Sequence, residues 1–285
     1  MLIMSRGYFA IVQNNADVDY LSQAYWLALS IRATQSDVNN MSIMIDAETK
    51  KQITNKHKRV FDHIIDIPWL DESSESDWKI NNKWKVYWAT PYDETVLLDT
   101  DMVFPTDVSH WWPIMAQQDF WATTNTKTFR GETITSEYYR KTFVNNELPN
   151  IYTAFMYFKK SDIVTEIFEL TKYIFHNWQR FYHLFLKSDR PKHISGDVAI
   201  ALAINILGYE HLTTRNNCTE FPTFVHMKPE CQDVPGLCTN WSKVISSSWP
   251  TPDNLIVGNI KQNYPFHYVD KDWVTRIDTS ILEQA

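Results

Sequence analysis

The chain has 285 residues, of which 44% are hydrophobic and 21% are charged, a globular composition with enough apolar side chains for a sizeable core. Its formal net charge of -7 and its lack of a long basic run disfavour a nucleic-acid partner, because such proteins carry a basic patch or stripe. No stretch of the sequence reaches the roughly 18 apolar residues of a membrane-spanning helix.

The beginning of the sequence, residues 1–12, is typical of the approach to a first strand. A polar stretch interrupts it and no small-residue cleavage pattern follows, so a secretory signal peptide is not expected. Cys218, Cys231 and Cys238 are odd in number and lack the spacing of a zinc site, which argues against a disulfide framework. We therefore expect a reducing, cytoplasmic setting.

Strand and helix signals alternate through the first part of the chain. Short apolar runs predict strands, and apolar residues at helical spacing or polar helix formers predict helices. The strands are expected at 8–12, 41–45, 60–67 and 95–98, and the helices at 17–33, 48–56 and 84–90. Because alternating strands and helices form right-handed crossovers, the pattern predicts an α/β fold with a mainly parallel sheet.

The second half of the chain is less regular. The apolar run 151–158 predicts a strand, and helical patterns cover 161–185 and 196–207. Segment 213–252 is rich in Pro, Asn, Ser and Cys, and its composition indicates loops. No internal repeat or linker divides the sequence, so we expect residues 1–285 to form a single domain.

Two carboxylates, Asp99 and Asp101, follow the strand expected at 95–98. They would repel each other unless a cation or a proton lay between them, and side chains two apart in an extended chain point to the same side. In open parallel sheets, ligands bind beyond the carboxyl ends of the strands. Hard oxygen ligands suit Mg²⁺ or Mn²⁺, so the pattern favours a divalent-cation site over a solvated acidic turn.

Two classes of enzyme use a hydrophobic strand followed by Asp-x-Asp. In phosphatases similar to haloacid dehalogenases the first aspartate, here Asp99, attacks phosphorus. That class carries the motif on its first strand and needs a second acidic motif, for which segment 195–200 offers only Asp197. The GT-A glycosyltransferases instead place Asp-x-Asp after a nucleotide-binding half.

Segment 83–104, KWKVYWATPYDETVLLDTDMVF, resembles the glycogenin-like family 8 glycosyltransferases. The similarity covers roughly residues 8–207 and implies a GT-A fold, with a Rossmann-like, mainly parallel twisted sheet flanked by helices and a less regular C-terminal part. Residues 1–110 would form a nucleotide-binding half, and residues 111–285 an acceptor and sugar half. The positions that match the family pattern are Lys83, Trp88, Tyr92, Asp93, Asp99 and Asp101.

The resemblance also implies roles for residues near the N-terminus. Val12, Gln13 and Asn14 would line a uridine pocket, and Tyr20 would stack on the base. Lys83 would reach the phosphate or the sugar of the donor. The donor-binding set would further include Thr100, between the two aspartates.

Two later segments match the family in part. Segment 151–158 takes the place of its Asn-Ser-Gly strand but carries Tyr152, Thr153 and Ala154, so the asparagine that contacts the sugar is absent. Segment 195–203 resembles its Gly-Asp-Gln helix start, in which Asp197 matches and Val198 replaces the glutamine.

Segment 265–273, PFHYVDKDW, resembles the family pattern His-x-x-Gly-x-x-Lys-Pro-Trp without its glycine and proline. The resemblance implies that His267 completes the metal site and that Lys271 holds the diphosphate. His226 is a second candidate for the metal-binding role.

Together these features predict a transferase that uses Mn²⁺ or Mg²⁺ and moves a hexose from a UDP-sugar, UDP-glucose or UDP-galactose, to an acceptor hydroxyl. Asp99, Asp101 and His267 would hold the cation, while Lys83, Asp197 and Lys271 would be the catalytic side chains. The family retains the anomeric configuration; with inversion, Asp197 would be the candidate base. A phosphatase and a non-catalytic nucleotide-sugar binding protein remain the alternatives.

Overall fold

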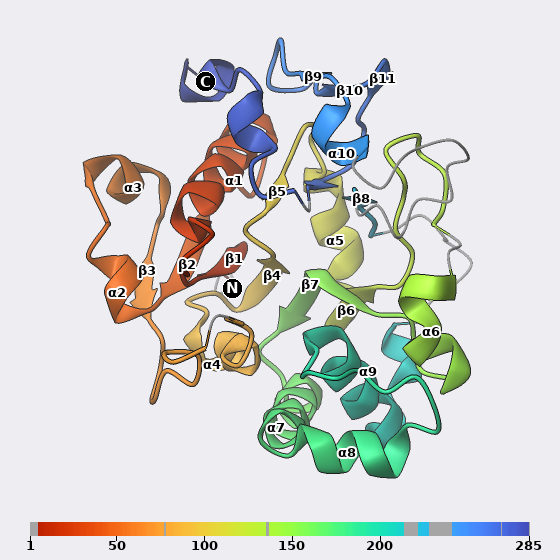
Figure 1. Ribbon diagram of the computed structural model, residues 1–285. Coiled ribbons are helices and arrows are strands. Elements are labelled where there is room, and N and C mark those ends of the chain that lie inside the picture. The colour runs from red at the N-terminus through yellow and green to blue at the C-terminus, as the bar shows by residue number, and fades with distance from the viewer. Residues whose placement is uncertain are drawn as a thin grey trace.

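The computed structural model describes residues 5–76, 78–134, 137–213, 222–227, 241–268 and 270–284. Its largest element is a six-stranded sheet with the strand order β3-β2-β1-β4-β7-β6 (Figure 1). The strands are β1 (Arg6–Val12), β2 (Met41–Ile45), β3 (Ile64–Asp66), β4 (Glu94–Leu98), β6 (Phe120–Thr123) and β7 (Tyr152–Lys159).

The sheet is mainly parallel, as the alternation of strands and helices predicts. β1 pairs in parallel with both β2 and β4, and β2 pairs in parallel with β3. Only β7 among these strands runs the other way, since it pairs antiparallel with β4 and with β6. After β1 the chain builds outward through β2 and β3 and then returns to the other side of β1 for β4, so the strand order reverses between β1 and β4. Ligands of open α/β sheets bind at such a point.

Helices cover both faces of the sheet because alternate side chains of each strand point to opposite faces. Tyr8 and Ala10 of β1 pack with α1 (Tyr20–Thr34) and α5 (Trp112–Met115). Phe9, between them, packs on the opposite face, where α7 (Asp162–His176) and α9 (Gly196–Leu207) lie. Figure 1 shows α1 and α5 above the sheet and α7 and α9 below it. Burial on both faces explains why the central strands are continuous apolar runs.

Local capping divides the helix expected at 48–56 into two. The Asp46 carboxylate accepts hydrogen bonds from the backbone N–H groups of Glu48 and Thr49 and begins α2 (Ala47–Lys50). Thr54 forms a capping box with His57 and begins α3 (Asn55–Val60). α3 ends at Val60, the first residue of the strand expected at 60–67, and only Ile64–Asp66 of that range form a strand, β3. These capping residues decide where each helix begins, whereas the polarity of the segment indicates only that it is helical.

Two other predicted helices differ in detail. The helix expected at 84–90 is a 3₁₀ turn, η1 (Lys83–Lys85), followed by α4 (Val86–Ala89). The long helix expected at 161–185 is broken into α7 and α8 (Trp178–Phe185) at Asn177, whose φ of -130° and ψ of 27° are not helical. The Asn177 side-chain amide donates a hydrogen bond of 3.0 Å to the carbonyl of Tyr173, which satisfies a carbonyl at the end of α7.

The C-terminal part contains two small sheets that the sequence did not predict. One has the order β5-β12-β8 and the other β11-β10-β9. Part of the expected loop segment 213–252, with all three cysteines, lies outside the described residues, and the rest includes strands and a helix. The added elements are β5 (Met102–Val103), β8 (Val225–His226), β9 (Ser247–Ser248), β10 (Ile256–Val257), β11 (Ile260–Lys261), β12 (Phe266–His267), α6 (Glu137–Asn145), α10 (Trp241–Val244), α11 (Ser280–Gln284), η2 (Ser109–Trp111), η3 (Glu210–Leu212) and η5 (Val274–Arg276).

Within the described ranges, none of the helices combines the length and the apolar character needed to cross a bilayer.

Gly7 in β1 is required by the packing of Tyr92. A Cβ atom at position 7 would lie 2.3 Å from Cζ of the Tyr92 ring, and the Tyr92 hydroxyl is held by Ser42 Oγ at 2.7 Å. We expect Gly7→Ala to lower the free energy of unfolding by about 1–3 kcal/mol, the usual cost of overpacking, as measured by urea unfolding. Tyr92→Leu in the same chain should recover part of that loss; strictly additive losses would contradict the steric explanation.

Candidate active site

A cavity of about 360 Å³ opens at the carboxyl ends of β1 and β4, where the strand order reverses. This volume is within the range of small-molecule pockets. Its wall combines segments that are far apart in the sequence: the ends of β1 and β4, the start of α9 and the C-terminal segment around β12. Asp99, Thr100 and Asp101 all line it.

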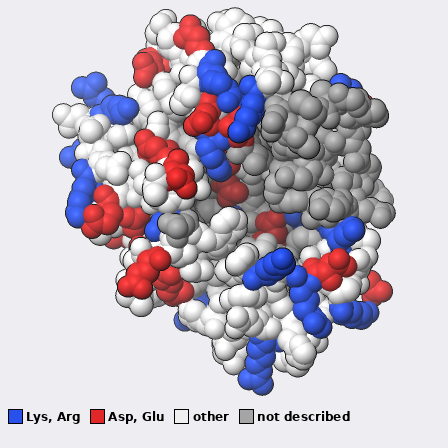
Figure 2. Space-filling view, in the orientation of Figure 1, with Lys and Arg blue, Asp and Glu red and all other residues white. Residues whose placement is uncertain are grey.

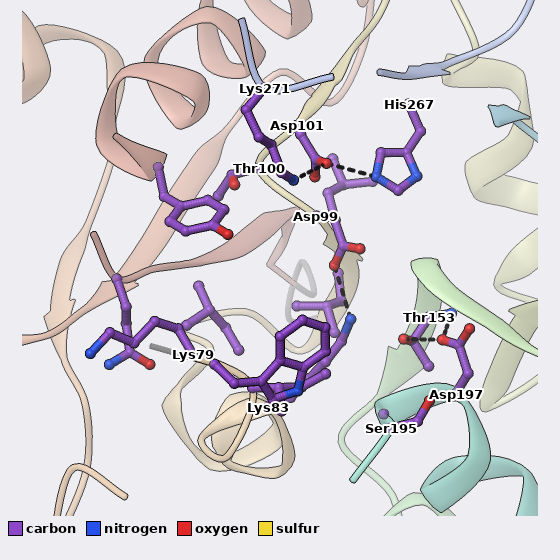
Figure 3. A pocket seen from close by; sticks show the side chains of 18 of the residues that line it. Lys79, Lys83, Asp99, Thr100, Asp101, Thr153, Ser195, Asp197, His267 and Lys271 are labelled. Carbon is purple, nitrogen blue, oxygen red and sulfur yellow. Dashed lines mark hydrogen bonds and ion pairs between the residues drawn. The ribbon is translucent and has the colours of Figure 1, made fainter. Parts of the chain in front are cut away.

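Asp101 is buried between two partners, as Figure 3 shows. One carboxylate oxygen lies 3.0 Å from Nε2 of His267 and 2.5 Å from Nζ of Lys271. Burial alone would raise the pKa of the Asp101 carboxyl, but His267 and the positive charge of Lys271 together bring it well below its ordinary value. Asp101 is therefore ionised at neutral and at mildly acidic pH.

Backbone pairing explains why His267 meets Asp101. The chain turns directly after β4, and β5 begins with Met102, the next residue after Asp101. β5 pairs antiparallel with β12, which places Met102 opposite His267, and the backbone N–H of Tyr268 donates to the carbonyl of Asp101 at 3.0 Å. The smaller sheet thus carries the histidine to the acidic end of β4.

The structure brings Asp99, Asp101 and His267 close enough to share one cation. Each offers a ligand atom, and these atoms lie within 4.8 Å of one another. Two carboxylate oxygens and one imidazole nitrogen suit Mn²⁺, and the oxygens suit Mg²⁺. The three residues therefore fit a divalent cation.

His226, the second candidate ligand, lies behind His267 and not against the carboxylates. The Nδ1 atoms of the two rings are 2.9 Å apart, and β8 pairs His226 with His267 of β12. Nε2 of His267 can bind a cation only when it carries no proton, which puts the proton on Nδ1, and this N–H can then donate a hydrogen bond to Nδ1 of His226. His226 is therefore placed to fix the tautomer of His267, as groups behind metal ligands commonly do.

Lys83 reaches the cavity from η1 and forms an ion pair of 2.9 Å with Asp99. Its side chain passes over the start of α9, where a Cβ atom at Gly196 would lie 3.1 Å from Cδ of Lys83. The glycine of the Gly-Asp pair thus leaves room for the lysine beside it.

Asp197 stands in the first turn of α9, after the N-cap residue Ser195. Its carboxylate accepts hydrogen bonds from the Thr153 backbone N–H at 2.9 Å and hydroxyl at 2.6 Å, and it pairs with Arg140 at 2.9 Å. Burial would raise its pKa, but the positive charges of Arg140 and Lys83 and the bonds from Thr153 lower it overall. Thr153 thus holds this carboxylate through its backbone and its side chain.

Arg140 is one residue near the site that the sequence did not single out. Its guanidinium lies between two aromatic rings, 3.8 Å from the centroid of Phe143 and 3.9 Å from that of Tyr152. It also donates to Asn150 Oδ1 at 2.6 Å and to the carbonyl of Ile151. No motif surrounds Arg140 in the sequence, so its proximity to Asp197 emerges only in the folded chain, where Arg140 contacts Tyr152 of β7 and Asp197 of α9.

The residues expected to bind uridine fall into two groups. Gln13 and Tyr20 line the cavity, and Nζ of Lys271 lies 5.4 Å from the Tyr20 ring centroid. Val12 is fully buried in the core, and the Asn14 backbone N–H donates to Thr49 Oγ1 at 2.8 Å. Neither side chain is among those that line the cavity, and the binding roles of all four residues stay predictions.

Gln13 is held by two polar residues that the sequence did not single out. Asn82 donates to Gln13 Oε1 at 2.9 Å, and the Gln13 amide donates to Asp71 at 3.2 Å. Asn82 also donates to Asp71 at 2.6 Å, so the three side chains form a closed network at one edge of the cavity.

Three of the six matched motif positions are structural. Trp88 packs against the core below the sheet, Tyr92 covers Gly7, and the Asp93 carboxylate accepts two hydrogen bonds of 2.9 Å from Ser5. Tyr92 and Asp93 thereby tie the residues just before β4 to those at the start of β1. The other three positions, Lys83, Asp99 and Asp101, line the cavity.

The stability supplied by Asp197 should depend on pH. Its pKa in the folded protein is below the ordinary value of 3.8, so its contribution is complete above that value and is lost as the pH falls through the lowered pKa. In urea unfolding at a series of pH values, the difference between wild type and Asp197→Asn should be constant near neutrality and shrink below about pH 4. A difference that grows on acidification would contradict the lowered pKa.

Comparisons with known proteins find similarity of overall structure but no match of sequence. No protein-family model matches the chain, and no curated protein sequence matches it. Among solved structures, apo mouse xyloside xylosyltransferase 1 is similar with a TM-score of 0.49 and 10% identity over 75% of this chain and 85% of that one. The glycosyltransferase GlyE of Streptococcus pneumoniae TIGR4 is similar with a TM-score of 0.44 and 11% identity over 76% of this chain and 46% of its own, so the match spans less than half of GlyE. Its apo form is similar with a TM-score of 0.37 and 12% identity, over 73% of this chain and 44% of that one.

Proposed function

We propose that the chain is a metal-dependent glycosyltransferase that moves a hexose from a UDP-sugar, UDP-glucose or UDP-galactose, to an acceptor hydroxyl with retention of configuration. The observation that carries the proposal is the convergence of Asp99, Asp101 and His267 at the strand-order reversal, in one cavity with Lys83, Asp197 and Lys271.

The charges of the cavity support a diphosphate ligand together with a cation. The lining residues include three carboxylates, Asp99, Asp101 and Asp197, whose formal charge is cancelled by Lys79, Lys83 and Lys271. A divalent cation would bring the formal net charge of the lining to +2, which complements the negative charge of a nucleotide diphosphate. Without the cation, a dianionic ligand would meet a neutral site.

The reaction breaks the bond between the anomeric carbon and the diphosphate oxygen, which keeps the electron pair. A new bond forms between the anomeric carbon and the acceptor oxygen, and the acceptor proton passes to the departing phosphate. A bound divalent cation would supply Lewis-acid stabilisation of the negative charge on the leaving group. Lys83 and Lys271, which now pair with Asp99 and Asp101, would donate to the phosphate oxygens as that charge develops.

Asp197 is better suited to electrostatic support than to proton transfer. A lowered pKa makes a carboxylate a weak base, whereas an efficient general base has a pKa near the working pH. Its permanent negative charge can instead stabilise the positive charge that builds on the sugar ring, and its fixed bonds to Thr153 orient it. This role favours retention over an inverting mechanism with Asp197 as base.

Thermal-shift and turnover measurements test the function and separate it from the two alternatives. We expect UDP to raise the melting temperature strongly only with Mn²⁺ present, and UDP-glucose or UDP-galactose to be turned over with release of UDP. Hydrolysis of p-nitrophenyl phosphate without any need for UDP-sugars would instead support the phosphatase. UDP binding without turnover, across a pooled screen of acceptors analysed by mass spectrometry, would support a binding protein.

A further inference from the structure

The outer side of α8 exposes large apolar side chains. Leu184 and Phe185 on α8 are 62% and 44% exposed, and Tyr173, near the end of α7, is 57% exposed. The ring of Phe181 lies between the two exposed rings. Its centroid is 5.7 Å from that of Tyr173 and 5.6 Å from that of Phe185. We call Tyr173, Phe181, Leu184 and Phe185 the α8 patch.

Of the α8 patch, only Phe181 packs against the core, and the other three side chains are exposed. The inner side of α8 is held by Tyr182, which is buried and whose hydroxyl accepts from the backbone N–H of Ser195 at 3.1 Å. Contiguous exposed apolar groups of this kind on a folded protein mark a surface that contacts something else.

The segment that carries most of the α8 patch is basic, in contrast to the chain as a whole. Segment 178–193 contains four cationic residues and one acidic residue, a net charge of +3, whereas the whole chain carries -7. On α7, the carboxylate of Glu169 is paired with Lys172 at 3.7 Å. Figure 2 shows Lys and Arg side chains, with some Asp and Glu among them, on the lower part of this face, where Figure 1 places α8. The cationic residues of the segment, all of them exposed, are Arg180, Lys187, Arg190 and Lys192.

We propose that the α8 patch and its basic border dock the protein on the surface of an anionic lipid membrane. Apolar side chains enter the boundary between headgroups and acyl chains, while surrounding Lys and Arg side chains attract acidic headgroups. A symmetrical contact with a second copy is disfavoured, because it would bring two surfaces of charge +3 together. The inference goes beyond the proposed transferase reaction and does not depend on it.

Co-sedimentation of the full chain with lipid vesicles tests the proposal. We expect sedimentation with vesicles that mix phosphatidylglycerol with phosphatidylcholine, little with phosphatidylcholine alone, and a decrease as NaCl is raised. Arg180→Gln/Lys187→Gln should weaken binding to the mixed vesicles about 30-fold, since each basic residue near the surface contributes roughly one kcal/mol. Leu184→Ser/Phe185→Ser should weaken it at least about tenfold.

Two matched variants control for loss of charge and of apolar surface elsewhere. Lys58→Gln/Arg59→Gln removes two exposed basic groups from α3, and Val244→Ser removes a 75% exposed apolar side chain from α10. Neither should change vesicle binding.

The proposal is overturned if anionic vesicles do not sediment the protein, if neutral vesicles do so equally, or if the control variants weaken binding as much as the α8 variants. A dimer in analytical ultracentrifugation that Leu184→Ser/Phe185→Ser abolishes, without vesicle binding, would assign the patch to a second copy instead.

Discussion

Replacing Asp101 with asparagine should lower the rate of UDP release from a UDP-sugar by about 10²–10³-fold, the usual effect of losing one electrostatic stabiliser of a transition state. The substitution keeps the size of the side chain but removes the negative charge that His267 and Lys271 now share. The weaker ligand should also raise the Mn²⁺ concentration needed for half-maximal rate. Initial rates over a Mn²⁺ series measure both effects.

Asp66→Asn is the matched control for this experiment. Asp66 ends β3, its side chain is 70% exposed, and its pair with Lys50 lies on the surface. We expect the rate and the Mn²⁺ dependence of the Asp66→Asn protein to equal those of wild type. Circular dichroism and melting curves establish that Asp101→Asn is folded. Unchanged turnover by a folded Asp101→Asn protein would remove Asp101 from the mechanism.

The sequence predicted the half of the site that lies within one continuous segment. Asp99 and Asp101 follow an apolar run whose end is the end of a strand, and a parallel sheet places such ends at a ligand-binding edge. The central strands were equally visible, because burial on both faces produces apolar runs such as β2. Both signals are local, and local signals are what a single sequence contains.

The family resemblance named further site residues one by one, but no local pattern encodes how the strands that carry them pair. His226 and His267 lie on strands of only two residues, too short to show a period of two, and their choice of partner is fixed by pairing with β5. The family resemblance assigned the metal-binding role to His267 and kept His226 as a second candidate, and the sheet places the two rings one behind the other. The break at Asn177 was missed for a related reason, since the apolar spacing continues across it from α7 into α8.

Arg140 represents the contacts that only the folded chain supplies, and its removal should have a large effect on stability. Its side chain is 5% exposed and pairs with Asp197, whose side chain is 23% exposed where it faces the cavity. Breaking a buried ion pair by removing one partner leaves the other charge without compensation. We expect Arg140→Met to lower the free energy of unfolding by about 3 kcal/mol, as measured by urea unfolding at neutral pH. Lys51→Met, which breaks the exposed pair with Glu48, should cost less than about 1 kcal/mol.

A double-mutant cycle separates the pair from the other contacts of Arg140. If the ion pair is the main contribution, the loss in Arg140→Met/Asp197→Asn should fall short of the sum of the single losses by at least about 1 kcal/mol. Additive losses would instead assign the stability to the rings of Phe143 and Tyr152 and to the bonds with Asn150 and Ile151. Coupling would mean that the Asp197 carboxylate and the Arg140 guanidinium act as one unit. Arg140 lies on α6 and Asp197 on α9, and 57 residues separate them in the sequence.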